Sequence, residues 1–174
     1  MNPEAGADRD PAEELRALFD TALPRVYGYL LPRCGRAGLA EDLTAETFLA
    51  AADAARRSDA APVSVPWLIG VARHKLVDHW RRTAREERSL RAVEGPLELE
   101  DPWDVEIDTL RARHTLERLA PRHRAALTLR YLDDLPVPRV AELLDRSVHT
   151  TEGLLVRARA AFRRAYLAEE TGDA

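Results

Sequence analysis

A stretch near the C-terminus, SVHTTEGLLVRARAAFRR (147–164), carries side chains suited to contacting DNA. An acid at its start, Glu152, can accept a hydrogen bond from the N4 amino group of cytosine. Arginines follow in the next turns, where guanidinium groups can bind phosphate oxygens. We expect bases to face His149, Thr150, Glu152 and Gly153, and phosphates to face Arg157, Arg159, Arg163 and Arg164.

The residues just before this stretch predict how it is positioned. A short helix over about 138–144 is followed by a tight turn at Asp145-Arg146 and by Ser147, a good N-cap for the next helix. Apolar residues on the two helices have the spacing of a steep crossing that exposes the start of the second helix, as in a helix-turn-helix. They are Val140, Leu143 and Leu144 on the first helix and Leu155, Ala158 and Phe162 on the second. An ordinary antiparallel helix pair with a solvated arginine face explains the spacing equally well.

A second segment, VPWLIGVARHKLVDHWRRTAREER (65–88), combines basic and aromatic side chains. Ile69, Ala72, Leu76 and Trp80 form one helical stripe, and Arg81, Arg85 and Arg88 form another. Tryptophans that flank basic residues suit stacking on unpaired bases. Trp67, beside Leu68 and Ile69, is more typical of a core residue, and for Trp80 both interpretations stay open.

A third segment, LAEDLTAETFLAAAD (39–53), places like charges on one side of a helix. Asp42 and Glu46 are four residues apart, and Asp53 follows seven residues later. Like charges at such spacing cost an isolated helix about 0.2–0.5 kcal/mol. The stripe is most simply a solvated face, and it would also suit a basic surface on a partner protein.

The sequence gives little support for an enzyme. The five histidines are scattered, and His74 and His79 are five residues apart, which misses the i, i+4 spacing of helical metal ligands. Neither a glycine-rich phosphate loop nor a nucleophile elbow is present in the sequence. We therefore expect no catalytic residues, no metal, no cofactor and no small-molecule substrate.

Composition favours a cytoplasmic protein with a hydrophobic core. Of the 174 residues, 45% are hydrophobic, yet no apolar run approaches 18 residues and the first residues are polar and acidic. This pattern predicts neither a membrane span nor a secretory signal. Cys34 is the only cysteine, so no intrachain disulfide can form.

The pattern of elements predicts an all-α fold with two small helical domains. Strand and hairpin signals are almost absent, and helical periodicity recurs along the chain. We expect domains over 11–88 and 109–169, joined by an acidic linker over 89–108. The expected helices span about 11–22, 24–34, 39–57, 66–88, 108–119, 121–132, 138–144 and 147–168. Residues 83–108 contain nine acidic and three basic groups, whereas residues 109–174 contain nine acidic and twelve basic groups.

Together and in order, the three segments resemble a bacterial extracytoplasmic-function (ECF) sigma factor of the sigma-70 family. AEDLTAETFLAA is similar to that family's polymerase-binding stretch, and WLIGVARHKLVDHWRR to its promoter −10 segment. The sequence LERLAPRHRAALTLRYLDDLPVPRVAELLDRSVHTTEGLLVRARAAFRR is similar to its −35 helix-turn-helix domain. The resemblance covers about residues 12–168.

The resemblance implies a dissociable initiation subunit that binds core RNA polymerase and promoter DNA. It implies polymerase contacts by Asp42, Ala45, Glu46 and Leu49, and −10 contacts by His74, Lys75, Asp78, Arg81 and Arg82. It implies −35 contacts by Ser147, His149, Thr150, Glu152, Gly153 and Arg157. The acidic linker would thread toward the nucleic-acid channels of the polymerase. Sigma factors of this kind are commonly held inactive by an anti-sigma factor, so the resemblance implies such a partner too.

Several residues depart from the family's pattern. Ala45 stands where glutamine is frequent, which weakens one expected polymerase contact, and His74 stands where asparagine is frequent, which alters the expected −10 preference. Asp145 replaces the usual glycine of the turn, and Glu152 and Leu154 stand where basic residues are common. We therefore expect an unusual −35 preference. Each phosphate that a protein neutralises contributes about −0.9 to the slope of the logarithm of the binding constant against the logarithm of the salt concentration. Only four arginines lie near 157–164, and Glu152 opposes them, so we also expect weak DNA binding by the free chain.

Two other functions fit parts of the sequence. A stand-alone helix-turn-helix regulator usually dimerises to span two half-sites, and the sequence has no heptad seam for a dimer. A helical adaptor that binds only proteins would tolerate changes at His149, Thr150 and Glu152 without an effect on transcription.

Overall fold

The computed structural model describes residues 11–57, 63–90 and 109–171, and every regular element in these ranges is helical. The predicted all-α fold is thus confirmed. The contacts between Cα atoms divide the chain into two compact units, Met1–Leu76 and Val77–Ala174. The division falls inside helix α3 (Val65–Leu90), which contributes its first half to unit 1 and its second half to unit 2. Most of the expected acidic linker, residues 91–108, lies outside the described residues.

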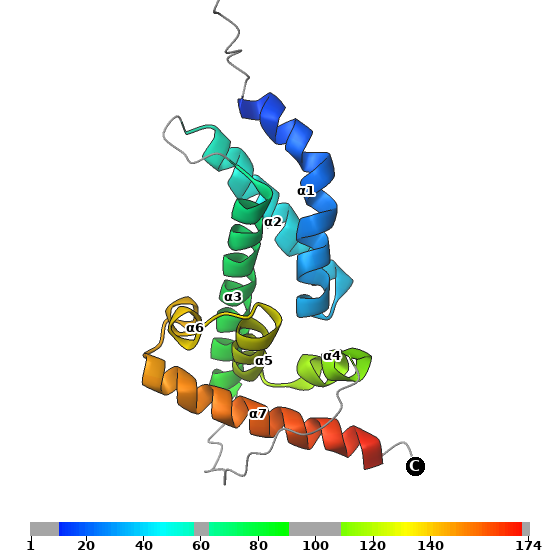
Figure 1. Cartoon of the computed structure of the whole chain (residues 1–174), viewed down its shortest axis with the longest axis vertical. Coiled ribbons are helices and arrows are strands. Elements are labelled where there is room, and N and C mark those ends of the chain that lie inside the picture. Colours follow the sequence, from blue (N-terminus) through cyan, green and yellow to red (C-terminus); the bar gives the residue numbers. More distant parts are fainter. Residues whose placement is uncertain (1–10, 58–62, 91–108, 172–174) are drawn as a thin grey trace, which may run out of the picture. The chain divides into compact units, whose positions relative to one another are not determined.

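Unit 1 is built around the paired helices α1 (Pro11–Cys34) and α2 (Ala37–Ala55), which run side by side (Figure 1). The sequence predicts a new helix at Pro24, and that prediction is wrong because α1 continues through Pro24 and Pro32. A proline inside a helix removes one backbone hydrogen bond. The side chain of Pro24 lies on the exposed side of α1, while a fully buried stripe at Ala22, Val26 and Leu30 passes on the other side and holds the helix together.

The end of α1 fixes the start of α2. Gly35 adopts φ 73°, a left-handed conformation that suits glycine, and its N–H donates to the Leu31 carbonyl at 3.2 Å. Within α2, the hydroxyl groups of Thr44 and Thr47 are buried and donate to backbone carbonyls of the preceding turn at 2.6 and 2.7 Å. These hydrogen bonds allow the inner face of α2 to bury polar side chains beside Leu43 and Ala51.

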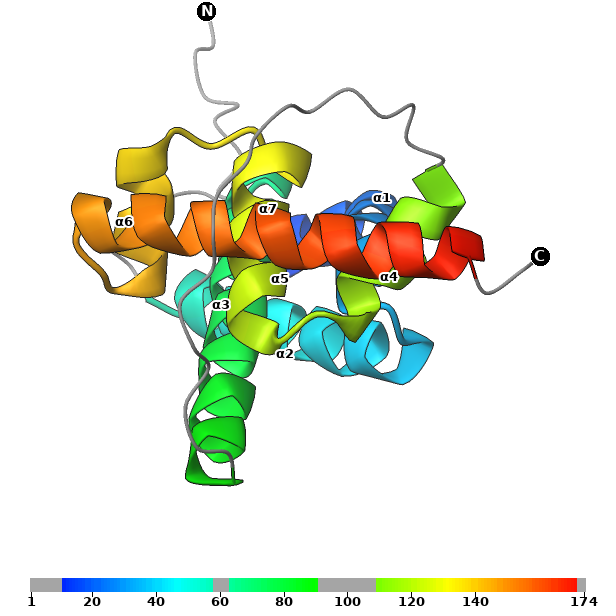
Figure 2. The same cartoon turned by 90° about the horizontal axis from the view of Figure 1, so that it is seen from below.

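Unit 2 contains helices α4 (Thr109–Arg118), α5 (Pro121–Leu127), α6 (Val137–Leu144) and α7 (Val148–Thr171). Figure 2 shows α7 lying across α4, α5 and α6, and all three contact it. One core cluster contains Leu119, Leu127, Ala158, Phe162 and Tyr166. The single helix expected over 121–132 is α5 followed by a π-helical turn, η1 (Thr128–Leu132). The expected helices near 108–119, 138–144 and 147–168 correspond to α4, α6 and α7.

Candidate nucleic-acid and polymerase interfaces

The turn between α6 and α7 has helix-turn-helix geometry. Asp145 ends α6 with φ 55° and ψ 55°, so the aspartate adopts the left-handed conformation for which glycine is the usual residue. The N–H of Arg146 donates to the Ala141 carbonyl at 3.0 Å, which closes the turn. The Thr150 N–H donates to the Ser147 Oγ at 3.1 Å, and the predicted N-cap is confirmed.

This turn leaves the start of α7 exposed above a buried inner face. His149, Thr150 and Glu152 are exposed, whereas Thr151, Leu154 and Leu155 are buried. Leu154 is 3% exposed and is therefore a core residue. A basic side chain is common at this position in the family, so its replacement by leucine leaves the outer face with one positive charge fewer. The expected base-facing residues thus share an accessible surface at the front of the helix.

The arginines of α7 lie on two flanks of this surface. Arg157 follows Thr150 by seven residues and Gly153 by four, so these three share one flank. Arg159 follows Glu152 by seven residues and lies on the other flank, where its Nη1 donates to the Tyr131 hydroxyl at 3.3 Å. Two separate basic flanks fit the two phosphate backbones that border a DNA groove better than one continuous arginine face would.

Replacement of Gly153 by alanine tests whether this surface faces the bases. A Cβ atom at position 153 would lie 3.4 Å from the Arg157 Nη1, which is ordinary van der Waals contact. Gly153→Ala should therefore stabilise α7 by about 1 kcal/mol through helix propensity. The new methyl group would also face the bases, so we expect weaker −35 recognition together with a higher melting temperature.

Thermal melts and promoter-binding assays on the same variant measure both effects. Gly28→Ala is the matched control, because no atom lies within 4 Å of its added Cβ and Gly28 lies in α1. The control should gain stability without any change in promoter recognition. Unchanged −35 recognition in Gly153→Ala would remove Gly153 from the interface.

The outer face of α2 carries the residues expected to contact polymerase. Asp42, Ala45 and Leu49 are exposed, and Leu49 is 67% exposed despite its apolar side chain. Glu46 is paired with Lys75 of α3, with 3.3 Å between the Glu46 Oε2 and the Lys75 Nζ. The face therefore has less free negative charge than the sequence suggests, and Leu49 is its most exposed large apolar group.

Helix α3 carries the residues expected to contact the −10 element. His74, Asp78 and Arg82 are exposed, whereas Lys75 is occupied by its ion pair with Glu46. Trp67 is half-buried and Trp80 is only 3% exposed. Trp80 is therefore a core residue, and its ring is not accessible for stacking on a base.

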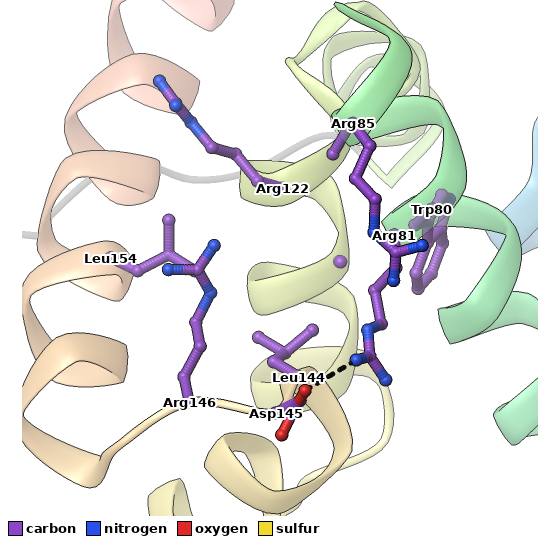
Figure 3. A pocket seen from close by; sticks show the side chains of 10 residues that line it. Trp80, Arg81, Arg85, Arg122, Leu144, Asp145, Arg146 and Leu154 are labelled. Carbon is purple, nitrogen blue, oxygen red and sulfur yellow. Dashed lines mark hydrogen bonds and ion pairs between the residues drawn. The ribbon is translucent and has the colours of Figure 1, made fainter. Parts of the chain in front are cut away.

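The remaining −10 candidate, Arg81, contacts the helix-turn-helix within unit 2. Its Nη2 lies 2.9 Å from the Asp145 Oδ2 (Figure 3). Its Nη1 lies 3.8 Å from the Asp78 Oδ1. Asp145 is 79% exposed, and an ion pair this exposed is worth about 0–1 kcal/mol. Arg81 can therefore exchange Asp145 for another anion at little cost.

Unit 2 also contains a pocket that the sequence did not predict. It has a volume of about 320 Å³, and Figure 3 shows arginines of α3 on one side and Arg146, at the helix-turn-helix, on the other. Its lining residues are Trp80, Arg81, Ala84, Arg85, Arg122, Ala125, Leu144, Asp145, Arg146 and Leu154. Only the stripe of Arg81 and Arg85 is visible in the sequence, because the other arginines reach the pocket through tertiary packing.

No group of three or more histidine, cysteine, aspartate or glutamate side chains in the described ranges could hold a metal ion. None of the described helices combines the length and the apolar character that crossing a membrane requires.

Comparisons with known proteins give the family. The model of Sigma-70 region 2 matches residues 18–86, and that of Sigma-70, region 4 matches residues 109–162. The ECF RNA polymerase sigma factor SigM of Bacillus subtilis is 32% identical over 153 residues, which cover 86% of this chain and 93% of SigM. The ECF sigma factor BldN of Streptomyces coelicolor is 30% identical over 161 residues, which cover 87% of this chain and 60% of BldN.

A solved structure agrees in fold. The sigma factor RpoE of Bartonella quintana, crystallised with the anti-sigma factor NepR, aligns over 88% of this chain and 96% of its own with a TM-score of 0.52 and 16% identity. The chain belongs to the ECF sigma factors of the sigma-70 family.

Proposed function

We propose that this chain binds core RNA polymerase and directs it to promoters through separate −10 and −35 contacts. The observation that carries the proposal is the exposed start of α7, held above a buried inner face by the left-handed turn at Asp145. A helix presented in this way can enter the major groove of DNA. Two basic flanks beside the exposed surface supply the phosphate contacts that set its register.

We assign each proposed contact to one part of the chain. Residues 11–88 would form the domain for polymerase and the −10 element, 89–108 the linker, and 109–169 the domain for the −35 element. The proposed polymerase contacts are Asp42, Ala45, Glu46 and Leu49, and the −10 contacts are His74, Lys75, Asp78, Arg81 and Arg82. The proposed −35 contacts are Ser147, His149, Thr150, Glu152, Gly153 and Arg157. An anti-sigma partner is part of the proposal, because sigma factors of this kind commonly have one.

Two of the −10 candidates must exchange partners on binding. Lys75 would leave Glu46, and Arg81 would leave Asp145, before either contacts a promoter strand. Both ion pairs are partly exposed, with side-chain exposures between 31% and 79%, so each is weak. The exchange also frees Glu46 for a basic surface on the polymerase, which couples the two proposed contacts through one ion pair.

Run-off transcription tests the proposal. Purified core RNA polymerase is assayed with and without the chain on a library of promoters from the source genome. We expect start sites that depend on the chain and share −35 and −10 elements. An absence of transcripts with folded protein and active core polymerase, together with no uptake of the chain by polymerase, would contradict the function.

The same assay tests base recognition by Glu152. Glu152→Ala should relax selection at one −35 base pair by about tenfold to hundredfold, the usual cost of one lost base contact. Glu142→Ala is the matched control: it removes the same charge from α6, where Glu142 pairs with Arg139 on the exposed surface. Equal promoter selection by both variants would place the base contact elsewhere on α7.

A further inference from the structure

We propose that the pocket in unit 2 binds a small molecule that carries phosphate groups. The first reason is its charge. Four arginines and one aspartate line it, so the lining has a formal charge of +3. The arginines come from α3, from α5 and from the turn before α7, three segments that are distant in the sequence. Like charges gathered in this way repel one another unless an anion balances them.

The second reason is that only some of these arginine side chains already pair with another group of the protein. Arg81 is held by Asp145, with 2.9 Å between the Arg81 Nη2 and the Asp145 Oδ2. The guanidinium groups of Arg85 and Arg146 have neither a hydrogen-bond nor an ion-pair partner among the residues that the structure describes. Two guanidinium groups are thus available at the pocket, and a guanidinium presents paired N–H donors that match the oxygens of a phosphate.

The third reason is the shape and the apolar part of the lining. A volume of about 320 Å³ falls at the lower end of the range for small-molecule pockets. Ala84, Ala125, Leu144 and Leu154 contribute apolar surface beside the arginines. Pockets for small organic ligands are lined mostly by apolar groups with a few polar ones. Here five of the ten lining residues are charged, which favours an anionic ligand with a small apolar part. The proposed ligand goes beyond promoter DNA, although one lining residue, Arg81, is also a proposed −10 contact.

Isothermal titration of the full chain with inorganic pyrophosphate tests the site. We expect one pyrophosphate to bind per chain. Arg85→Ala combined with Arg146→Ala should weaken binding about hundredfold, because each variant removes charge-assisted hydrogen bonds. Arg25→Ala combined with Arg57→Ala is the matched control, since it removes the same charge from exposed arginines of unit 1. Circular dichroism checks that both double variants are folded.

A variant that should bind pyrophosphate more tightly gives a second test of the site. Asp145→Asn removes the negative charge of the lining, and asparagine tolerates the left-handed backbone that Asp145 adopts. This variant should bind pyrophosphate about fivefold more tightly, the effect of removing one nearby like charge in a solvated site.

Three outcomes would overturn the proposal. The first is no saturable binding of pyrophosphate by the unchanged chain. The second is an equal loss of binding in the control pair, which would show general charge attraction. The third is binding of a short duplex DNA, but not of pyrophosphate, that depends on Arg85 and Arg146, which would assign these arginines to the DNA backbone.

Discussion

Replacement of Leu49 by aspartate is expected to weaken binding to core RNA polymerase about thirtyfold, because an apolar anchor at the centre of an interface contributes about 2 kcal/mol. Leu49 is 67% exposed on the face of α2 that carries Asp42 and Ala45. A substitution at so exposed a position should change the free energy of unfolding by less than about 0.5 kcal/mol. The loss would therefore report on the interface and not on folding.

Fluorescence anisotropy of the labelled chain against core polymerase measures this effect. Leu110→Asp is the matched control, because Leu110 is 75% exposed and lies on α4 of unit 2. The control should bind polymerase like the unchanged chain. Full binding by Leu49→Asp would remove the outer face of α2 from the proposed polymerase contact.

Truncation of Phe162 to alanine should produce the largest loss of stability, about 3–5 kcal/mol. Phe162 is 6% exposed in the core cluster of unit 2, and its ring stacks on Tyr166 with 5.7 Å between centroids. The truncation removes apolar contacts and leaves a cavity beneath α7. Since a small domain has only a few kcal/mol of stability, unit 2 should be largely unfolded at physiological temperature.

Urea denaturation followed by circular dichroism measures the change. Leu110→Ala serves as the control, because it removes an exposed apolar side chain from the same unit. We expect Phe162→Ala to lose −35 recognition together with its structure, while polymerase binding through α2 of unit 1 is retained in part. A stable Phe162→Ala variant would contradict the core assigned to unit 2.

The sequence by itself determined the fold class, most of the helices and the cap that starts α7. These features depend on residues close together in the chain. Apolar side chains at helical spacing predict a helix, and Ser147 has only to reach the N–H of Thr150, three residues on. The exposed front of α7 could also be predicted, because the apolar residues between Thr151 and Phe162 define the buried face and leave the opposite face to solvent.

Local patterns failed where the outcome depended on packing. The continuation of α1 through Pro24 depends on the stripe that it buries against its surroundings, which outweighs one lost hydrogen bond. For Trp80, the sequence allowed both stacking on bases and burial, and only the packed structure decided for burial. Leu154, which the sequence pattern assigned neither to the core nor to the DNA surface, is also buried.

Only the tertiary structure decided which charged groups meet. Arg81 and Asp145 are separated by 64 residues, and no periodicity in the sequence connects them. The pairing of Lys75 with Glu46 and the gathering of Arg85 and Arg146 at one pocket are of the same kind. A long charged side chain is compatible with many solvated positions, whereas a buried apolar stripe is compatible with few. Hydrophobic patterning therefore specified the helices, and the packing of these helices fixed the partners of the charges.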